Sequence, residues 1–303
     1  MKPSILITGG AGLLAVNWAS AIKDRFAVTL AIHKRSICMN GVESHLIDLN
    51  APDVIAGELA QINAALVVNT AAVTSVDFCE SEPQIARHVN VDIARNVALA
   101  CKAHGTKLVH ISTDHVFGGT HAMLDETATI GPVNVYAQTK ADGEAAVLDV
   151  CPNAIVARTN FFGWGLPYRK SFSDTIIASL RTGSQIGLFS DAYFTPILME
   201  LLINAAHELV EADASGIFHM GGDERVSKYD FGLRIAHTFD LDAGLINPTL
   251  LAERHDLVPR PLDLSLDNLK LRNAVGHDIG DVGSQLEYLR SQNIRKLDLE
   301  IVY

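Results

Sequence analysis

Short apolar runs alternate with longer amphipathic stretches through the first half of the chain. The runs are built mainly from Ile, Leu, Val and Ala, and they lie at residues 5–8, 28–32, 66–69, 108–111 and 154–157. Such nearly continuous apolar runs are typical of strands covered on both faces, as in parallel sheets. Helical patterns at residues 12–25, 84–103 and 136–150 stand between them. The alternation predicts βαβ units and a doubly wound, parallel α/β sheet of the Rossmann type.

The rhythm of the pattern changes after about residue 158. A glycine- and aromatic-rich stretch at residues 161–165 leads into longer helical segments and isolated strands. A strand is expected at residues 216–220, where it would return to the main sheet. We therefore expect a dinucleotide-binding Rossmann domain over residues 1–160 and a smaller α+β substrate-binding lobe over residues 161–303.

Composition and net charge indicate which kinds of partner the chain binds. The chain has 303 residues, of which 48% are hydrophobic, and a formal net charge of -11. No basic field would attract nucleic acid, so we expect a small-molecule substrate; a homodimer is compatible with the sequence. No apolar run is long enough to cross a membrane. The four cysteines and twelve histidines show no paired short spacing, which predicts reduced thiols, a cytoplasmic protein and no metal site.

A glycine-rich turn follows the first predicted strand. It reads Thr-Gly-Gly-Ala-Gly-Leu-Leu-Ala at residues 8–15 and leads into a predicted helix. Glycine suits positions where φ is positive or where the backbone approaches a pyrophosphate, and the helix N-terminus then offers free N–H groups to the phosphates. A secretory signal would share this position, but its three glycines interrupt the apolar region that a signal requires. We expect Gly9, Gly12, Leu13 and Leu14 to contact a dinucleotide.

The second predicted strand ends in a basic cluster. His33, Lys34 and Arg35 stand where an acidic residue would bind the ribose hydroxyls of NAD. A solvated loop would explain the cluster equally simply, but a 2′-phosphate is the ligand that it suits, so we expect NADPH rather than NADH. The remaining expected cofactor residues are Asp48, Leu49, Ala71, Ala72 and Asn90.

Three further residues carry the candidate chemistry. Thr113 follows the predicted strand at 108–111 and faces the ligand edge of the sheet, with Ser112 as a weaker candidate for the same role. Tyr136 and Lys140 lie one helical turn apart, so they share a face. We expect the ammonium and the positive charge of the nicotinamide together to lower the pKa of the phenol, which then protonates a carbonyl while Thr113 holds the same oxygen. An exposed helix pair is the simpler alternative for this spacing.

Substrate contacts are expected from residues beside the chemical site. Asp114 and His115 follow Thr113, although a backbone cap and a packed histidine are the structural alternatives. Asn160 follows the last strand of the first half. Arg260 has the fork geometry that suits phosphate, while a structural ion pair would explain it as well.

In its motifs the chain resembles the extended short-chain dehydrogenase/reductases, and most closely the dTDP-4-dehydrorhamnose reductase group. The resemblance rests on the glycine turn and on Asn-Thr-Ala-Ala at 69–72, Val-Asn-Val-Asp at 89–92, Ser-Thr-Asp-His-Val-Phe at 112–117, Tyr-Ala-Gln-Thr-Lys at 136–140 and Arg-Pro-Leu-Asp at 260–263. It implies Thr113, Tyr136 and Lys140 as the catalytic set, NADPH as hydride donor, and a nucleotide-linked 4-keto-6-deoxysugar as substrate.

Departures from the family pattern fall in the substrate half. His115 replaces a tyrosine, Asn160-Phe161 replaces a Ser-Trp pair, and residues 191–197 lose a glutamine, a glycine and a threonine. A different sugar nucleotide or another carbonyl substrate therefore stays open. Two other functions also stay open: a nucleotide-sugar epimerase or dehydratase, and a non-catalytic subunit resembling the regulatory subunit of methionine adenosyltransferase.

Overall fold

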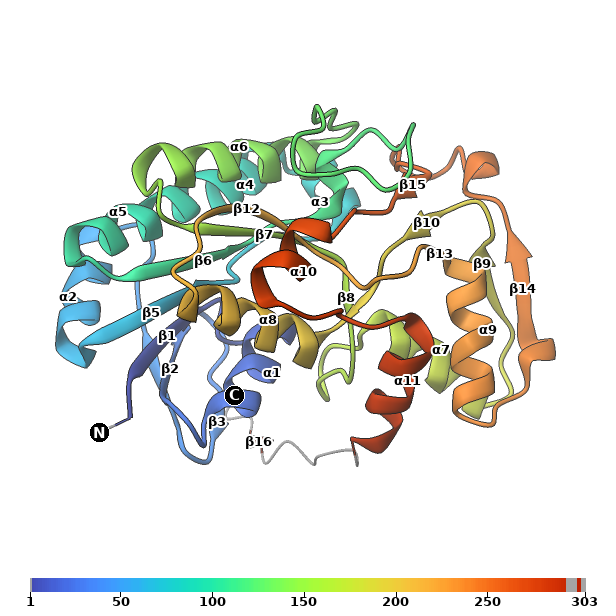
Figure 1. Ribbon diagram of the computed structural model, residues 1–303, viewed down its shortest axis with the longest axis horizontal. Helices are drawn as coiled ribbons and strands as arrows, with labels where there is room; N and C mark the ends of the chain where they lie inside the picture. The colour runs from blue at the N-terminus through green and yellow to red at the C-terminus, as the bar shows by residue number, and fades with distance from the viewer. Residues whose placement is uncertain (1, 293–298, 301–303) are drawn as a thin grey trace.

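The computed structural model describes residues 2–292 and 299–300, and a nine-stranded sheet runs through its larger part (Figure 1). The strands of this sheet are β1 Ser4–Thr8, β2 Ala27–Ile32, β3 Cys38–Met39, β4 Val42–Leu46, β5 Ala64–Asn69, β6 Lys107–Ile111, β7 Ile155–Thr159, β12 Gly216–Met220 and β16 Leu299–Glu300. Their order is β12-β7-β6-β5-β1-β2-β4-β3-β16. All neighbours from β12 to β4 pair in parallel. The strand order reverses at β1, which confirms the predicted doubly wound fold.

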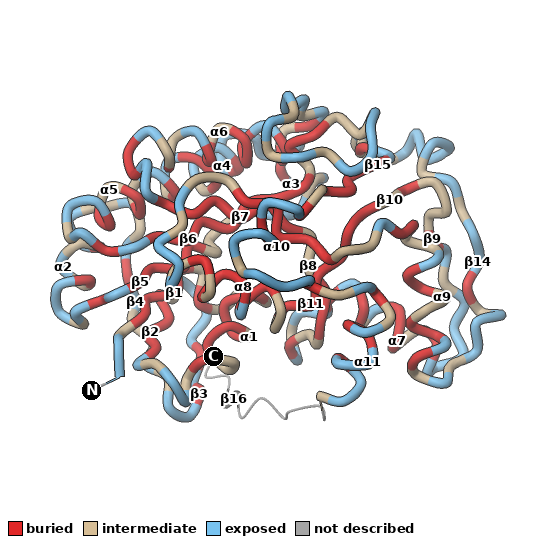
Figure 2. The backbone as a smooth tube through the Cα atoms, in the orientation of Figure 1, coloured by how far each residue is buried: buried red, intermediate tan, exposed pale blue. Residues whose placement is uncertain are grey.

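Helices cover both faces of this sheet. On one face lie α1 Leu13–Ile22, α8 Met199–Glu211 and α10 Leu269–Val275; on the other lie α2 Pro52–Ile62, α5 Ala94–His104 and α6 Val135–Val150. Each face has its own apolar core, and buried residues follow the strands and the inner helix faces (Figure 2). The indole Nε1 of Trp18 donates to His207 Nε2 at 3.1 Å, which ties α1 to α8.

The helix expected over residues 84–103 is interrupted. Its place is taken by α4 Pro83–Arg87, a π-helical turn at His88–Ile93 and α5, after a short α3 at Val76–Ser81. At the interruption α6 passes so closely that a Cβ on Gly143 would lie 2.3 Å from the carbonyl oxygen of Asn90. The long-range approach of α6, and not the local periodicity, accompanies the change in helical geometry.

The smaller lobe packs three helices around short strands and an aromatic core. Its helices are α7 Phe172–Arg181, α9 Lys228–Thr238 and α11 Val282–Ser291. Its strands are β8 Phe161–Phe162, β9 Ile186–Phe189, β10 Tyr193–Phe194, β11 Ile197–Leu198, β13 Val226–Ser227, β14 Ile246–Thr249 and β15 Asp263–Leu264. The rings of Phe162, Phe194 and Phe231 meet with centroids 5.1 and 5.4 Å apart. The strand expected at 216–220 is β12, which lies in the main sheet beside β7; a domain boundary at residue 160 stays a prediction.

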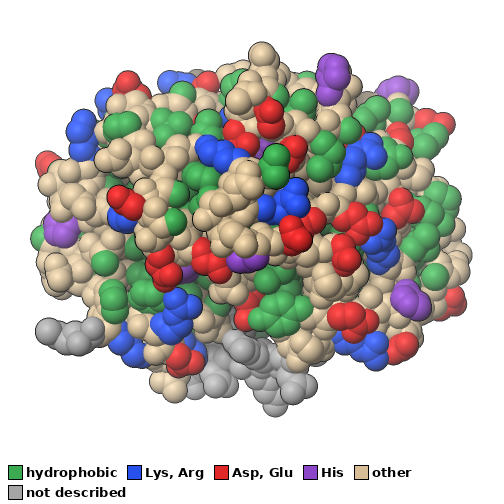
Figure 3. Space-filling view, viewed as in Figure 1, with side chains coloured by type: hydrophobic (Ala, Val, Ile, Leu, Met, Phe, Trp, Pro, Cys, Tyr) green, Lys and Arg blue, Asp and Glu red, His purple; other side chains and the backbone are tan. Residues whose placement is uncertain are grey.

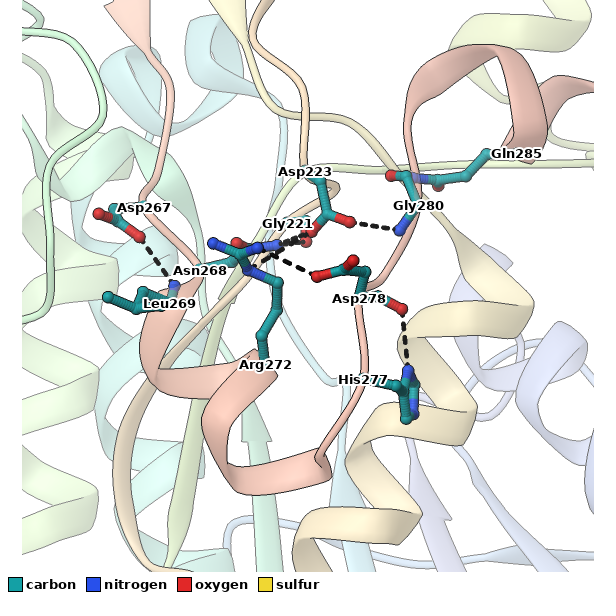
Figure 4. A network of polar contacts seen from close by, with 10 residues as sticks. All are labelled: Gly221, Asp223, Asp267, Asn268, Leu269, Arg272, His277, Asp278, Gly280 and Gln285. Carbon is teal, nitrogen blue, oxygen red and sulfur yellow. Dashed lines mark hydrogen bonds and ion pairs between the residues drawn. The ribbon is translucent and has the colours of Figure 1, made fainter.

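A polar cluster joins the loop after β12 to α10 and to the segment before α11 (Figure 4). We call it the joint network: Gly221, Asp223, Asp267, Asn268, Leu269, Arg272, His277, Asp278, Gly280 and Gln285. Asp223 accepts from the Gly280 N–H at 2.6 Å and from Asn268 Nδ2 at 2.7 Å. Arg272 lies between Asp223 and Asp278, at 3.9 and 3.1 Å. Hydrogen bonds and ion pairs engage most of the polar groups of the network, which joins the late helices to the loop after β12.

Charges on the surface are mixed. On the face in Figure 3, acidic and basic side chains are interspersed over the helices. Within the described ranges, no helix is long and apolar enough to cross a membrane.

Candidate active site

A cleft of about 1030 Å³ opens at the carboxyl ends of the central parallel strands. Residues at or just beyond the ends of β1, β2, β5, β6 and β7 line it, namely Gly9, Ile32, Thr70, Ile111 and Thr159. In open α/β sheets this edge, next to the point where strand order reverses, is where ligands bind.

The glycine turn forms one wall of the cleft. Gly9 has φ of +66°, and a Cβ there would lie 3.0 Å from the backbone of Ala71. The N–H of Gly10 donates to the carbonyl of Ala31 at 2.9 Å, so the turn lies directly against β2. Gly12 caps α1 without a side-chain hydrogen bond, which leaves the first N–H groups of the helix available to an anion. A dinucleotide phosphate fits this cradle, because its approach requires bare backbone.

The basic cluster after β2 lines the same cleft. His33, Lys34 and Arg35 all contribute to its surface. The guanidinium of Arg35 lies over the ring of Tyr168, 4.1 Å from the ring centroid, and the Tyr168 hydroxyl donates to the carbonyl of Ala11 at 3.0 Å. A residue of the segment after β8 therefore bridges the basic cluster and the glycine turn.

Most of the expected cofactor residues meet in this cleft. Asp48 lines it, and its carboxylate accepts from the N–H and Nδ2 of Asn50, which hold its pKa below the usual range. The lining includes Gly9, Gly12, Leu13, Leu14, His33, Lys34, Arg35, Asp48, Leu49, Ala71, Ala72, Tyr136 and Lys140.

Asn90 lies outside the lining of the cleft. Its Oδ1 accepts from the N–H of Val73 at 2.8 Å, and its Nδ2 donates to the Val73 carbonyl and to Thr139 Oγ1 at 3.1 and 3.0 Å. These three hydrogen bonds engage both the oxygen and the nitrogen of the Asn90 amide, and they connect the loop after β5 to α6. In this arrangement Asn90 positions the wall of the cleft and does not face a cofactor.

Tyr136 and Lys140 are presented by the start of α6. The side chain of Asn134 accepts from the Ala137 N–H at 2.9 Å and thereby caps the helix. Both Tyr136 and Lys140 are buried, and both line the cleft. Lys140 Nζ donates to the carbonyl of Ile111 at 2.7 Å, at the end of β6. The one-turn spacing of Tyr136 and Lys140 therefore places a phenol and an ammonium on the same wall of the cleft.

Burial governs the ionisation of this pair. It raises the pKa of Tyr136 above its usual value, and a hydrogen bond from Thr113 opposes that change only in part. The lowered pKa expected for Tyr136 is therefore not found in the protein alone, because the loss of hydration outweighs the nearby donors. Burial lowers the pKa of Lys140 to about 8, with the carboxylate of Glu144 opposing the decrease. In the ligand-free protein the phenol keeps its proton.

Behind the pair lies a buried ion pair that sequence reasoning missed. Glu144 accepts from Arg158 Nη2 at 2.7 Å, from Arg158 Nε at 3.0 Å and from Ser112 Oγ at 2.5 Å. It connects α6 to β6 and β7, directly beneath the catalytic candidates. Glu144 lies one helical turn after Lys140, and that spacing was the only sign in the sequence that it belongs to the site. Its pairing with Arg158 depends on the fold and could not be predicted from the sequence.

The substrate end of the cleft contains Asp114, His115 and Asn160. Asn160 Nδ2 donates to Asp114 Oδ2 at 2.6 Å, and Thr113 Oγ1 donates to Asp114 Oδ1 at 3.1 Å. The ring of His115 meets the Tyr136 ring edge-on, with centroids 5.5 Å apart. Arg260 does not line the cleft; it pairs with Asp77 at 3.0 Å.

Two other residues of the cleft come from the glycine- and aromatic-rich stretch at 161–165 and from the loop that follows it. Phe161 lines the substrate end, and Arg169 lines the cleft while its Nη2 donates to Thr74 Oγ1 at 3.0 Å. The composition of residues 161–165 distinguished that stretch, but the contact of Arg169 with Thr74 in the first half of the chain could not be predicted from local pattern.

A glycine turn at a helix N-terminus, a Rossmann sheet and a tyrosine–lysine pair beside a threonine define the class of protein as a short-chain dehydrogenase/reductase. Within that class, a family model described as the RmlD substrate binding domain matches residues 1–290. The chain belongs to this family, which confirms the resemblance inferred from the motifs.

Relatives agree with this placement. A probable low-salt glycan biosynthesis reductase of Haloferax volcanii is 30% identical over 276 residues, covering 89% of this chain and 91% of that protein. A dTDP-4-dehydrorhamnose reductase of Aggregatibacter actinomycetemcomitans is 29% identical over 302 residues, covering 95% and 98%.

Solved structures show the same fold. A dTDP-4-dehydrorhamnose reductase of Bacillus anthracis in complex with NADP aligns with a TM-score of 0.86 at 24% identity, covering 97% of this chain and 100% of that chain. A hypothetical dTDP-4-dehydrorhamnose reductase of Sulfolobus tokodaii aligns with a TM-score of 0.80 at 28% identity, covering 93% and 98%.

Proposed function

We propose that this protein is an NADPH-dependent reductase of a nucleotide-linked 4-keto-6-deoxysugar, similar in reaction to the dTDP-4-dehydrorhamnose reductases. The observation that carries the proposal is the meeting of Thr113, Tyr136 and Lys140 in a cleft whose other end is a bare glycine turn. Family membership and the names of the relatives support the same reaction.

Each residue of the trio has a distinct part in this chemistry. NADPH, when bound, supplies the hydride that reduces the carbonyl carbon. Tyr136 donates its phenolic proton to the carbonyl oxygen, and burial keeps that proton in place beforehand. Thr113 hydrogen-bonds to the same oxygen and stabilises its developing charge. Lys140 follows Tyr136 by one helical turn and lines the same cleft, where its ammonium would favour the phenolate that Tyr136 becomes.

The basic cluster supports NADPH over NADH. His33, Lys34 and Arg35 line the cleft beside the glycine turn, where a 2′-phosphate would lie. Arginine suits that group because its fork binds phosphate oxygens in pairs. The four cysteines Cys38, Cys79, Cys101 and Cys151 are free, which agrees with a reaction in the reducing cytoplasm.

A substrate panel tests the proposal. Purified protein is mixed with NADPH and with 4-keto-6-deoxysugars linked to thymidine, uridine or guanosine diphosphate, and NADPH oxidation is followed by absorbance. We expect stoichiometric oxidation with at least one of them and a reduced sugar by NMR. Matched reactions with NADH should be slower. If no member of the panel is reduced, the proposed function is wrong.

The same panel separates the competing functions. An epimerase would change the sugar without net consumption of NADPH. A regulatory subunit would leave every sugar unchanged and would co-purify with a larger enzyme. Turnover of NADPH that disappears with the Tyr136→Phe variant distinguishes the reductase from both.

A further inference from the structure

A short turn from the substrate half of the chain reaches the cofactor end of the cleft. Leu166 and Arg169 exchange two backbone hydrogen bonds, at 2.8 and 3.0 Å, so that Pro167 and Tyr168 form the tip between them. We call residues 166–169 the tip hairpin. Leu166 is buried in the apolar core on the α1 face of the sheet. The base of the tip hairpin is therefore anchored, which holds Tyr168 in a defined place.

The residue at position 164, just before the tip hairpin, is held from two sides. Asn17 Nδ2, on α1, donates to the carbonyl of Trp164 at 3.3 Å. The indole Nε1 of Trp164 donates to the carbonyl of Leu289, on α11, at 3.2 Å. Because α1 begins directly after the glycine turn, the first of these bonds ties the tip hairpin to the element that would receive the phosphates of a dinucleotide.

Tyr168 contacts both cofactor elements of the cleft. Its hydroxyl donates to the carbonyl of Ala11 in the glycine turn at 3.0 Å, and the guanidinium carbon of Arg35 lies 4.1 Å from its ring centroid. Ala11 and Arg35 line the cleft, whereas Tyr168 is not part of the lining. The ring would therefore influence a bound cofactor through Arg35 and the glycine turn, and not by touching it.

The stacked guanidinium of Arg35 is suited to a phosphate ligand. Arg35 is exposed on the loop after β2, where an unsupported side chain of this length would lose conformational freedom on binding. Contact with an aromatic face restricts it beforehand. A guanidinium has five N–H donors, and no carboxylate from the described ranges pairs with this one, so its charge is available to an anion.

A second stacked arginine in the molecule shows the contrasting arrangement. The guanidinium carbon of Arg225 lies 3.6 Å from the ring centroid of Tyr193, but its Nε and Nη2 donate to Asp263 Oδ2 at 2.9 and 2.7 Å. This pair lies outside the lining of the cleft. The Arg225 charge is therefore neutralised within the fold, while the Arg35 charge is stacked in the same way and faces the cleft.

We propose that Tyr168 is a positioning residue for cofactor choice, whose ring holds the Arg35 guanidinium where the 2′-phosphate of NADPH would lie. This inference deepens the proposed function and rests on it for the identity of the cofactor. It assigns one determinant of the NADPH preference to the substrate half of the chain. The hydroxyl bond to Ala11 fixes the ring against the glycine turn, so the sites for the diphosphate and for the 2′-phosphate are held in one arrangement.

Binding measurements without turnover test the role of Tyr168. Calorimetry compares 2′,5′-ADP with 5′-AMP, which differ only in the 2′-phosphate, and NADPH with NADH. The variants are Tyr168→Leu, which removes the ring, Tyr168→Phe, which keeps it, and Tyr193→Leu, which removes the matched ring beneath Arg225. We expect Tyr168→Leu to weaken binding of 2′,5′-ADP and NADPH about three- to tenfold, with 5′-AMP and NADH within about twofold of the wild type. Tyr168→Phe and Tyr193→Leu should discriminate like the wild type.

A double-mutant cycle shows whether Tyr168 acts through Arg35. Arg35→Leu should lose the preference for the 2′-phosphate, and adding Tyr168→Leu to it should cause no further loss of that preference. A ring that only supported the fold would weaken binding equally in both backgrounds. Additive losses of the preference in the double variant would therefore contradict the proposal.

Two further outcomes would overturn the role of Tyr168. One is an unchanged ratio of the NADH and NADPH dissociation constants in Tyr168→Leu, and the other is equal weakening of both cofactors. If Tyr168→Leu does not fold, Tyr168→Gln takes its place. Tyr168-dependent discrimination beside a silent sugar panel would reject the reductase reaction alone. An active panel that prefers NADPH, beside unaltered discrimination in the variant, would reject the role of Tyr168 alone.

Discussion

The joint network and the substrate end of the cleft are both polar and partly buried, yet their polar groups are satisfied to different degrees. In the joint network the carboxylate of Asp223 accepts from Gly280 and Asn268, and the cation of Arg272 lies between two carboxylates. In the cleft, His115 Nδ1 and Thr159 Oγ1 are buried without a hydrogen-bond partner among the described residues. Satisfied polar groups stabilise a fold, whereas unsatisfied ones destabilise it until a ligand arrives. The difference distinguishes polar groups that stabilise the fold from polar groups that are available to a ligand.

Removing the phenol at the catalytic end should give the largest effect. Tyr136→Phe removes the proton donor but little volume, so we expect turnover to fall about 10²- to 10⁴-fold with stability nearly unchanged. Initial rates of NADPH oxidation and urea denaturation measure the two quantities. NADPH affinity, followed by fluorescence, serves as the control. A variant as active as the wild type would remove Tyr136 from the mechanism.

The buried ion pair beneath the catalytic candidates should show the next largest effect, on stability. Glu144→Gln leaves the guanidinium of Arg158 buried without a counter-charge. We expect a loss of about 3–5 kcal/mol in the free energy of unfolding. Glu287→Gln is the matched control, since Glu287 is exposed on α11, and it should stay within about 0.5 kcal/mol. A loss no larger than that of the control would contradict the structural role.

In the joint network the effect should be smaller and confined to stability. Asp223→Ala leaves the Gly280 N–H and the Asn268 amide without their acceptor. We expect the free energy of unfolding to fall by about 1–3 kcal/mol. Turnover per folded molecule should equal that of the wild type. A selective loss of turnover would show that the joint network belongs to the active site and would remove the contrast.

The last prediction concerns the pH dependence of stability. The pKa of Lys228 is about 8 in the folded protein against a usual value of 10.5, so the unfolded chain binds more protons between these values. Stability contributed by this group therefore rises with pH across that window, by no more than about 1.4 kcal/mol per pH unit.

Denaturation of wild type and Lys228→Met at pH 8 to 10 isolates this contribution. We expect the wild type to gain stability relative to the variant as the pH rises. Lys270→Met should follow the wild type, because its ammonium has an acceptor. If the free energy of unfolding changes with pH in the same way for wild type and Lys228→Met, the charged form of Lys228 does not destabilise the folded protein.

Local geometry explains what the sequence could predict. The glycine turn and the Tyr136–Lys140 spacing depend on neighbouring residues alone, so their positions on a turn and on one helix face follow directly. The parallel strands followed from their continuous apolar runs. Both sets of features meet at one edge of the sheet because the fold class requires it.

Long-range contacts explain what it could not. The break at residues 88–93 accompanies the close passage of Gly143, and the Glu144–Arg158 pair joins elements that only the fold brings together. The direction of the Tyr136 pKa depends on burial, which no spacing reveals. Lys228 and Tyr168 lie on the later half of the chain, where no motif marked them.

The place of β12 at the edge of the main sheet has a consequence for how the chain acquires its structure. During synthesis β7 is complete while its neighbour, residues 216–220, has yet to be made. Until then β7 presents an open edge, and strands in that state are prone to pair with other chains. A fragment ending near residue 160 should therefore aggregate, even though it contains the whole glycine turn and the whole tyrosine–lysine pair. We therefore expect the cofactor half and the substrate half to fold as one cooperative unit.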